Sequence, residues 1–176
     1  LEARNRDLTE TLEQQTATGE ILRVISGSPT DIQPVFDAIA ESVARLCESF
    51  DAVLYRRDGD RLVLAAHHGP IAIGRVGDFS FPIHGSVAGR AVLDQRAAHV
   101  GDVQAEASSF PVSSGHARDF EFRTILSVPL MREGSAIGAI SLRRTDVQLF
   151  TVRQIALLQT FADQAVIAIE NVRLFT

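Results

Sequence analysis

The chain has 176 residues, of which 45% are hydrophobic, and this length is enough to bury one core. Its formal charge of -5 and its scattered arginines disfavour nucleic acid as a partner, because phosphate recognition needs a concentrated basic surface. No apolar run approaches the roughly 20 residues that span a bilayer. With a single cysteine and no leader pattern, we expect a cytoplasmic location and no membrane contact.

The opening segment, residues 1–28, has a partly polar row of side chains spaced alternately by three and four, which is typical of a coiled-coil seam: Leu1, Asn5, Leu8, Leu12, Gln15, Gly19 and Leu22. We predict a signalling helix or coiled-coil linker here, within a chain that is a segment of a longer protein. A surface helix packed on its own domain is the alternative. The candidate dimer-interface residues of this segment are Leu8, Leu12 and Leu22.

A second helix is expected from about residue 30 to Cys47, with one apolar stripe at helical spacing. The pattern then changes to strands at 52–56 and 61–67, joined by an Asp-Gly turn that favours a hairpin. An irregular Gly-rich loop follows at 68–78, with a short extended piece at 79–83.

The middle of the chain alternates short elements with polar connections. We predict a short helix at 85–94, a strand at 98–100, a Ser-rich connection at 104–115 and a brief helix at 116–121.

The clearest strands are 124–131 and 136–142, and both faces of each should be covered because neither alternates between apolar and charged residues. Pro129 should lie at a bulge or an unpaired position. Thr151 and Gln154 form a capping box that begins the last helix, at 151–176. A seam of spacing three and four continues along it and supplies the other candidate dimer-interface residues: Leu158, Phe161, Ala165, Val172 and Phe175.

Three stretches together resemble the GAF family. They are 125–130 with 137–142 after a turn at Gly134, the helix-and-strand segment 85–103, and the exit helix 161–171. The resemblance covers about 31–176 and gives a GAF domain at 29–176, with 151–176 its C-terminal helix.

The resemblance implies an α+β, profilin- or PAS-like fold. Its central antiparallel sheet has five or six strands, with the long N- and C-terminal helices on one face and short helices and loops over the other. In this family the ligand site lies between the sheet and the loops.

The sequence offers no catalytic group and no metal site. No nucleophile-elbow or phosphate-loop motif is present, and none of the five histidines forms a metal-ligand pair at helical spacing. We therefore expect no catalysis from this segment. A reductase of methionine sulfoxide, an enzyme found among GAF relatives, would need several pocket cysteines, and this chain has only Cys47.

The cofactors of known GAF subfamilies are each disfavoured, and the cofactor is unknown. The cyclic-nucleotide signature needs a lysine that the chain lacks. Bilin attachment needs a pocket cysteine, whereas Cys47 falls on the apolar stripe of the second helix. Haem needs a pocket histidine, and His84 or His116 would be the candidate, although each is more often a loop residue.

If a small ligand binds, we expect a wall of aromatic, imidazole and guanidinium groups. Tyr55 supplies a ring with a hydroxyl, and Arg123 pairs with an anionic group. The alternative is that these residues only complete the core and the surface. The candidate ligand-binding residues are Tyr55, His84, Phe110, His116, Phe120 and Arg123.

These features predict a homodimeric regulatory sensor that binds an unidentified small molecule or partner and transmits the change through its terminal helices. The resemblance implies a histidine kinase as the output domain, with a nucleotide cyclase as the alternative. A ligand-free dimerisation spacer with a collapsed pocket is the rival hypothesis.

Overall fold

The computed structural model describes residues 32–49 and 51–174, with side chains described as far as Asn171. The predicted linker 1–28, with Leu8, Leu12 and Leu22, lies outside the described residues. So do Phe175 and the side chain of Val172.

The core of the fold is a six-stranded antiparallel sheet in the order β3-β2-β1-β6-β5-β4. Two hairpins, β1–β2 and β5–β6, form its centre, and β1 pairs with β6 to join them. The strands are β1 Ala52–Asp58, β2 Arg61–His68, β3 Ser80–Pro82, β4 Ala98–Val100, β5 Thr124–Arg132 and β6 Ser135–Arg144.

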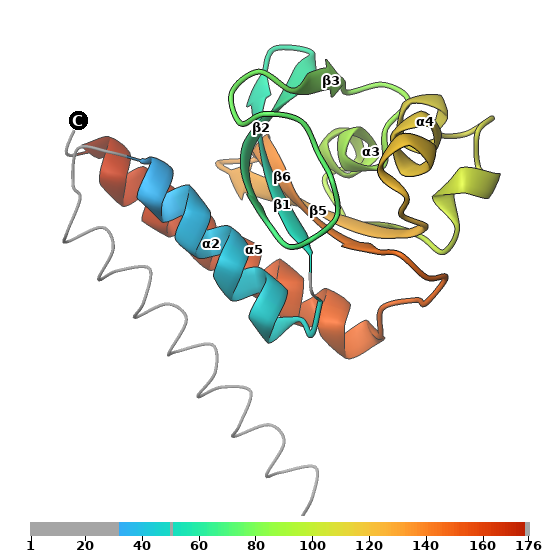
Figure 1. Ribbon diagram of the computed structural model, residues 1–176. Coiled ribbons are helices and arrows are strands. Elements are labelled where there is room, and N and C mark those ends of the chain that lie inside the picture. Colours follow the sequence, from blue (N-terminus) through green and yellow to red (C-terminus); the bar gives the residue numbers. More distant parts are fainter. Residues whose placement is uncertain (1–31, 50, 175–176) are drawn as a thin grey trace, which may run out of the picture.

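Helices cover the sheet in two separate layers (Figure 1). On one face, called here the helix face, α2 packs on β2 and α5 packs on β5. The other face, called here the loop face, carries α3, α4, η1 and the loop 69–79 (Figure 1). This arrangement confirms the predicted α+β fold. The helices are α2 Gln33–Leu46, α3 Val87–Asp94, η1 Val103–Ala105, α4 Pro111–Phe120 and α5 Val152–Leu174.

Alternation along β1 divides its side chains between two cores. Ala52 and Leu54 join the core of the helix face, whereas Val53 and Tyr55 join a cluster on the loop face. This follows from the two-residue repeat of a strand, which turns successive side chains to opposite faces. Both faces of the central strands are therefore covered, as the sequence predicted.

Two local predictions are confirmed, the capping box at the start of α5 and the position of Pro129. Thr151 N–H donates to Gln154 Oε1 at 2.9 Å, and Gln154 N–H donates to Thr151 Oγ1 at 3.1 Å, which is the predicted capping box. Pro129 lies on β5 two residues beyond the last pairing with β4, at Ser127, so its missing N–H costs no bond to that strand.

The connection predicted at 104–115 is wrong in its second half, and the predicted helix at 116–121 begins too late. Helix α4 starts at Pro111, five residues earlier, because proline is favoured in the first turn of a helix. Ser113 and Ser114 are buried in α4, although their composition resembles a loop.

The structure also corrects part of the predicted dimer seam. Leu158, Phe161 and Ala165 are 0%, 1% and 0% exposed in the isolated chain, where they pack in the core of the helix face. These side chains hold α5 on its own sheet and leave no surface for a partner subunit. The periodicity was that of a core face, which has the same spacing as a seam.

In the described part of the chain, no helix has the length and apolar character needed to cross a membrane.

Candidate functional site

The loop face holds a small space between the sheet, α3, α4 and the loop 69–79, which we call the aromatic site. Its volume is about 20 Å³, roughly the room for one water molecule. Side chains from β1, β3, α3, α4, β5, β6, the loop and the connection between α4 and β5 surround it: Tyr55, Ile73, Phe79, Phe81, Ala88, Ser113, His116, Phe120, Phe122, Ile125 and Arg143.

Ring contacts fill the aromatic site. The Tyr55 and Phe81 rings meet almost perpendicularly, with centroids 5.0 Å apart. The His116 imidazole lies 5.2 Å from the Phe79 ring, 5.4 Å from Phe81 and 5.9 Å from Phe120. The Tyr55–Phe81 and Phe81–His116 pairs are edge-to-face, and aromatic pairs of this geometry add about 0.5–1.5 kcal/mol each beyond simple burial. The site is therefore closed by a mutually supporting cluster of rings.

The structure brings together three of the six candidate ligand residues. Tyr55, His116 and Phe120 border the aromatic site. His84 is exposed and lies outside its lining.

Phe110 and Arg123 also lie outside the lining. Phe110 packs against a neighbouring apolar cluster and carries the Arg90 guanidinium 5.7 Å above its ring. Arg123 forms a surface ion pair with Asp102, with Nη1 3.0 Å from Oδ2. Each of these two side chains already has a local partner.

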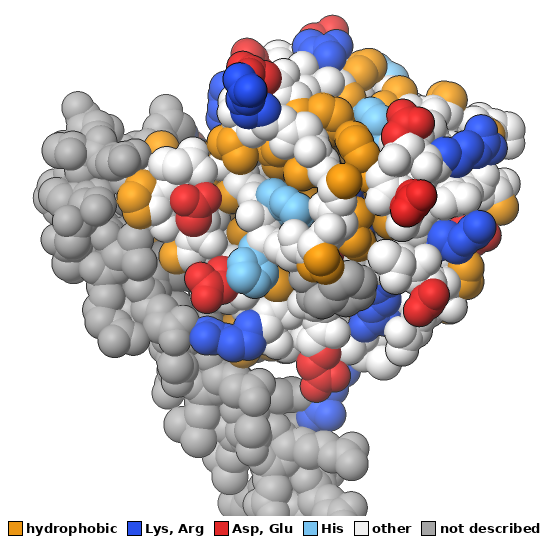
Figure 2. Space-filling view, in the orientation of Figure 1, with side chains coloured by type: hydrophobic (Ala, Val, Ile, Leu, Met, Phe, Trp, Pro, Cys, Tyr) orange, Lys and Arg blue, Asp and Glu red, His pale blue; other side chains and the backbone are white. Residues whose placement is uncertain are grey.

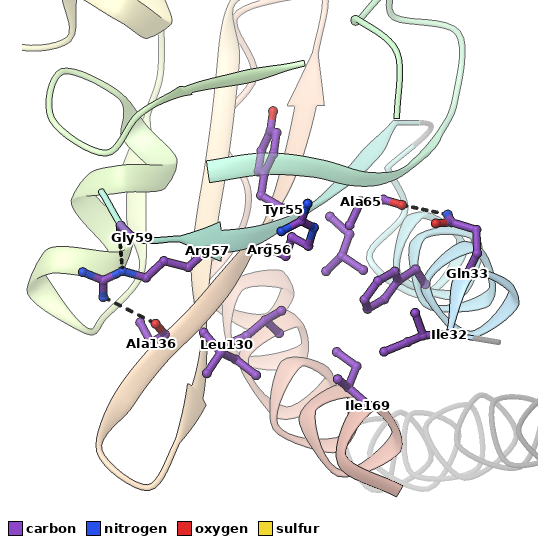
Figure 3. Close-up of a pocket in the computed structure, with 13 residues that line it drawn as sticks. Ile32, Gln33, Tyr55, Arg56, Arg57, Gly59, Ala65, Leu130, Ala136 and Ile169 are labelled. Carbon is purple, nitrogen blue, oxygen red and sulfur yellow. Dashed lines mark hydrogen bonds between the residues drawn. The ribbon is translucent and has the colours of Figure 1, made fainter. Parts of the chain in front are cut away.

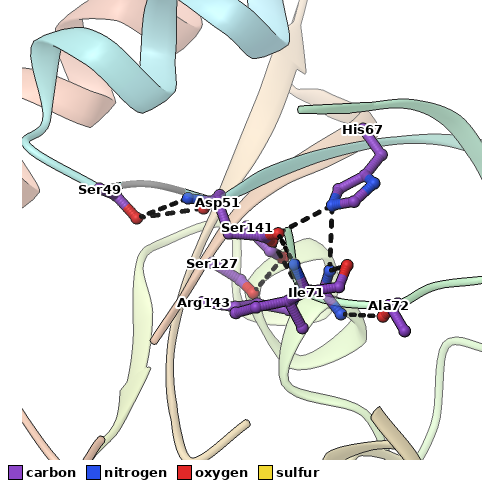
Figure 4. A network of polar contacts seen from close by, with 8 residues as sticks. All are labelled: Ser49, Asp51, His67, Ile71, Ala72, Ser127, Ser141 and Arg143. Atoms are coloured by element: carbon purple, nitrogen blue, oxygen red, sulfur yellow. Dashed lines mark hydrogen bonds and ion pairs between the residues drawn. The ribbon is translucent and has the colours of Figure 1, made fainter. Parts of the chain in front are cut away.

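A buried ion pair, called here the Asp51–Arg143 latch, fixes the loop over the aromatic site (Figure 4). Asp51 and Arg143 are 0% and 1% exposed, and Arg143 Nε donates to Asp51 Oδ1 at 2.8 Å. Asp51 Oδ2 accepts from Ile71 N–H at 3.0 Å and lies 2.8 Å from His67 Nε2. Arg143 donates to the carbonyls of Ile71 at 3.0 Å and Ala72 at 3.1 Å.

The latch joins three parts of the fold that are distant in sequence. It connects the start of β1, the end of β6 and the loop, and the Arg143 guanidinium also lies 5.1 Å from the centroid of the Phe122 ring. A buried charge pair is costly to separate, because each lone charge would stay in a low-dielectric environment. The loop is thus held in place by the sheet itself.

Burial shifts the pKa values of two side chains in the aromatic site. It raises the pKa of Tyr55 to about 12, with nearby Asp51 raising it further and Arg143 opposing the shift. Burial also lowers the pKa of His116, assisted by Arg143 and opposed by Asp119. Both groups are therefore neutral near pH 7.

Figure 2 shows the surface above this site. Apolar side chains and imidazoles gather in the middle of this face, where the loop 69–79 crosses the sheet in Figure 1, and charged side chains spread around the edge. This surface would meet a ligand or partner that approaches the aromatic site.

The aromatic site as it stands is too small for the cofactors of the known GAF subfamilies, because a space of about 20 Å³ has no room for a porphyrin, a bilin or a nucleotide unless its rings move. Cys47 is buried in the core of the helix face, where burial raises its pKa to about 12. Within the described part of the chain, no group of three or more His, Cys, Asp or Glu side chains is placed to hold a metal ion.

Sequence reasoning missed most of the lining. Phe79 and Phe81 were placed in a short extended piece, and no residue of the loop 68–78 was named as a candidate. No sequence pattern marked Arg143 as a site residue, because Arg143 and Arg144 together resemble the polar end of a strand. Its partner Asp51 lies 92 positions away, and only the pairing of β1 with β6 brings the two together.

Comparison with known proteins agrees with the fold. A family profile described as GAF domain matches residues 29–170. Because it covers most of the chain, this match carries more weight than any single solved structure.

Three solved structures superpose over most of their length. The GAF domain of a phosphoenolpyruvate-protein phosphotransferase from Acinetobacter has a TM-score of 0.76 and 16% identity, covering 94% of this chain and 95% of its own. A free methionine-R-sulfoxide reductase from Neisseria meningitidis, solved with its substrate, gives 0.72 and 24%, covering 93% and 92%. A methyl-accepting chemotaxis protein gives 0.73 and 21%, covering 90% and 97%.

At these identities the likeness concerns the fold alone. No curated protein matches the chain by sequence.

Proposed function

Because the chain belongs to the GAF family, whose domains act as regulatory sensory modules in signalling proteins, we propose that it senses through the aromatic site. A small molecule or a protein partner displaces the rings or the loop, and the change passes to an output domain through α2 and α5. The domain acts as a homodimer, and the output domain is a histidine kinase.

The observation that carries this proposal is the Asp51–Arg143 latch. It ties the cover of the site to β1 and β6, and both strands face the core beneath α2 and α5 with their other side chains. A ligand that moves the loop must strain or open the latch. Because close-packed cores transmit strain, the displacement reaches the terminal helices.

The choice of a histidine kinase rests on the resemblance of residues 161–171 to exit helices of bacterial sensor kinases. A nucleotide cyclase is the alternative output. The relatives named above include a phosphotransferase and a chemotaxis protein, so the same fold serves several outputs.

A ligand-free dimerisation spacer is the second candidate function. The small volume of the aromatic site favours it, because a ligand larger than one water molecule enters only after rings have moved. The two candidates differ in a single observable, which is whether a molecule bound at this site is retained or stabilises the fold.

Native mass spectrometry of freshly purified protein tests the proposal, since one spectrum reports subunit number and retained small molecules. We expect a dimer that carries extra mass, and that mass disappears in His116→Ala, which removes a ring from the site. His84→Ala is the matched control, because His84 is exposed and lies outside the lining. A bare dimer would favour the spacer, and a bare monomer at micromolar concentration would contradict the dimer.

A further inference from the structure

A second space, called here the helix-face hollow, lies on the opposite side of the sheet from the aromatic site. Its volume is about 840 Å³. Figure 3 shows Ile32 and Gln33 of α2 with Ile169 of α5 on one side of it, and Leu130 and Ala136 of the β5–β6 hairpin on the other. Ligand sites typically have volumes of about 300–1,000 Å³, and this space falls within that range.

Two β-bulges build the hollow. Leu54 pairs with Ala66 and Tyr55 with Leu64, which leaves Ala65 as an extra residue in β2. Leu130 pairs with Gly138 and Met131 with Ala136, which leaves Ile137 as an extra residue in β6.

Both bulged residues line the hollow. A bulge bends its strand and increases the local twist. The two bulges therefore bend both hairpins at the end of the sheet where α2 begins and α5 ends. Bulges are common beside binding sites for this reason. The hollow is thus a built feature of the sheet.

The walls are apolar and the one free charge is positive. Phe36, Leu54, Leu130 and Ile169 are its large apolar lining residues, of which Phe36 is half-buried and the other three are 1%, 2% and 6% exposed. No Asp or Glu is among the described lining residues. Arg56 also borders the space, is exposed, and forms no hydrogen bond or ion pair with the described residues.

The guanidinium of the neighbouring Arg57 already forms hydrogen bonds within the chain. Its Nε donates to the Gly59 carbonyl at 3.0 Å and its Nη1 to the Ala136 carbonyl at 3.5 Å, which fixes one rim of the hollow (Figure 3). Arg56 is thus the guanidinium available to a ligand.

We propose that the helix-face hollow binds an amphipathic monoanion, with a carboxylate at Arg56 and an apolar chain of the fatty-acid type against Phe36, Leu130 and Ile169. Apolar walls with one convergent polar group match such a molecule, because the walls desolvate the chain while the guanidinium fixes the head group. The site is distinct from the aromatic site, and either proposal stands if the other fails.

The position of the hollow gives such a ligand a regulatory role. It touches the first residues of α2 and the last described turns of α5, the two helices to which the proposed function assigns signal transmission. Tyr55 borders both the hollow and the aromatic site, so β1 lies between the two spaces.

Titration calorimetry of the whole chain with sodium decanoate at pH 7.5 tests the proposal. We expect saturable binding with one ligand per chain and an affinity about tenfold weaker in Arg56→Gln, the loss of one charge-assisted contact. Arg96→Gln is the matched control, since Arg96 is exposed and lies outside the hollow. Ile137→Trp, which adds volume at the half-buried bulge, should abolish binding.

Four outcomes would overturn it. The first is that decanoate does not bind or does not saturate, which would leave the hollow to another segment of this chain. Arg56→Gln binds as tightly as wild type, or decyltrimethylammonium binds as tightly as decanoate, which removes the anion requirement. His116→Ala weakens binding while Ile137→Trp does not, which places the ligand in the aromatic site. Arg56→Gln changes only the subunit number in native mass spectra, which makes the hollow a subunit interface.

Discussion

The two faces of the sheet are stabilised in different ways. On the helix face, apolar side chains such as Leu158 and Phe161 make a continuous core, with an open hollow at one end. On the loop face, a ring cluster and a buried ion pair close a space of about 20 Å³. A buried ion pair is either formed or broken, because separating it leaves each charge in a low-dielectric environment. This two-state character favours the loop face as the place of the proposed switch.

The largest expected effect comes from breaking the latch. Arg143→Met leaves the Asp51 carboxylate buried without its cation, and we expect it to lower the free energy of unfolding by about 3–5 kcal/mol. The control is Arg123→Met, which breaks the exposed pair with Asp102 and should cost about 1 kcal/mol or less. Urea denaturation measures both, and equal losses would show that the latch contributes no more than a surface pair.

The next effect concerns the helix face. Leu158→Ala should cost about 2–5 kcal/mol because it opens a cavity in the core beneath α5. Ile167→Ala on the same helix, where Ile167 is 61% exposed, should change stability by about 0.5 kcal/mol or less in the monomer. If the two costs were reversed, α5 would be packed through the opposite face and Leu158 would again be a candidate for a dimer seam.

A smaller effect tests the bulge that shapes the hollow. A Cβ added to Gly138 would lie 2.2 Å from the carbonyl oxygen of Tyr55, so Gly138→Ala must shift β1 or β6 and should cost about 1–3 kcal/mol. Gly115→Ala in α4 meets no atom within 4 Å and should instead stabilise by roughly 0.5–1 kcal/mol. Thermal unfolding distinguishes the two signs, and a neutral Gly138→Ala would contradict the close approach of these strands.

The smallest effect is a pH dependence carried by two histidines. Burial lowers the pKa values of His116 and His99, and in His99 the neighbouring Arg144 adds to the shift. As the pH falls, the unfolded chain binds protons at these sites near the ordinary pKa of about 6.5, and the folded chain binds them only at a lower pH. Stability should therefore be complete above about pH 6.5 and decrease as the pH falls below it.

His99 also accepts a hydrogen bond from Phe150 N–H at 3.2 Å, which its protonated ring cannot do. Unfolding measured from pH 7.5 to 5.0 should show a shallower decrease in His116→Gln and in His99→Gln than in wild type. An unchanged slope in both variants would assign the pH dependence to other groups.

The sequence predicted the elements whose signals are local. The capping box at Thr151 and Gln154 and the Asp-Gly turn of the first hairpin each depend on a few adjacent residues, and all appear in the structure. Helix α4 was placed too late because Ser and Gly have low helix propensity, and here tertiary burial of Ser113 and Ser114 overrides it.

The site was predictable only in part, for a different reason. Aromatic character indicated Tyr55 and Phe120, but Arg143 has meaning only beside Asp51, and that pairing is created by the sheet. Seam and core spacings are the same along a helix, so Leu158, Phe161 and Ala165 could not be assigned to one or the other before α5 was placed on β5.

Amide hydrogen exchange resolved by NMR tests the central claim, that the Asp51–Arg143 latch holds the loop 69–79 over the aromatic site. The Ile71 amide donates to the buried carboxylate of Asp51, whereas Val76 in the same loop is 44% exposed. We predict that Ile71 exchanges as slowly as the amides of β1 and β6, and that Val76 exchanges much faster. Fast exchange of Ile71 at the rate of Val76 would contradict the latch, and with it the closed aromatic site on which the proposed switch depends.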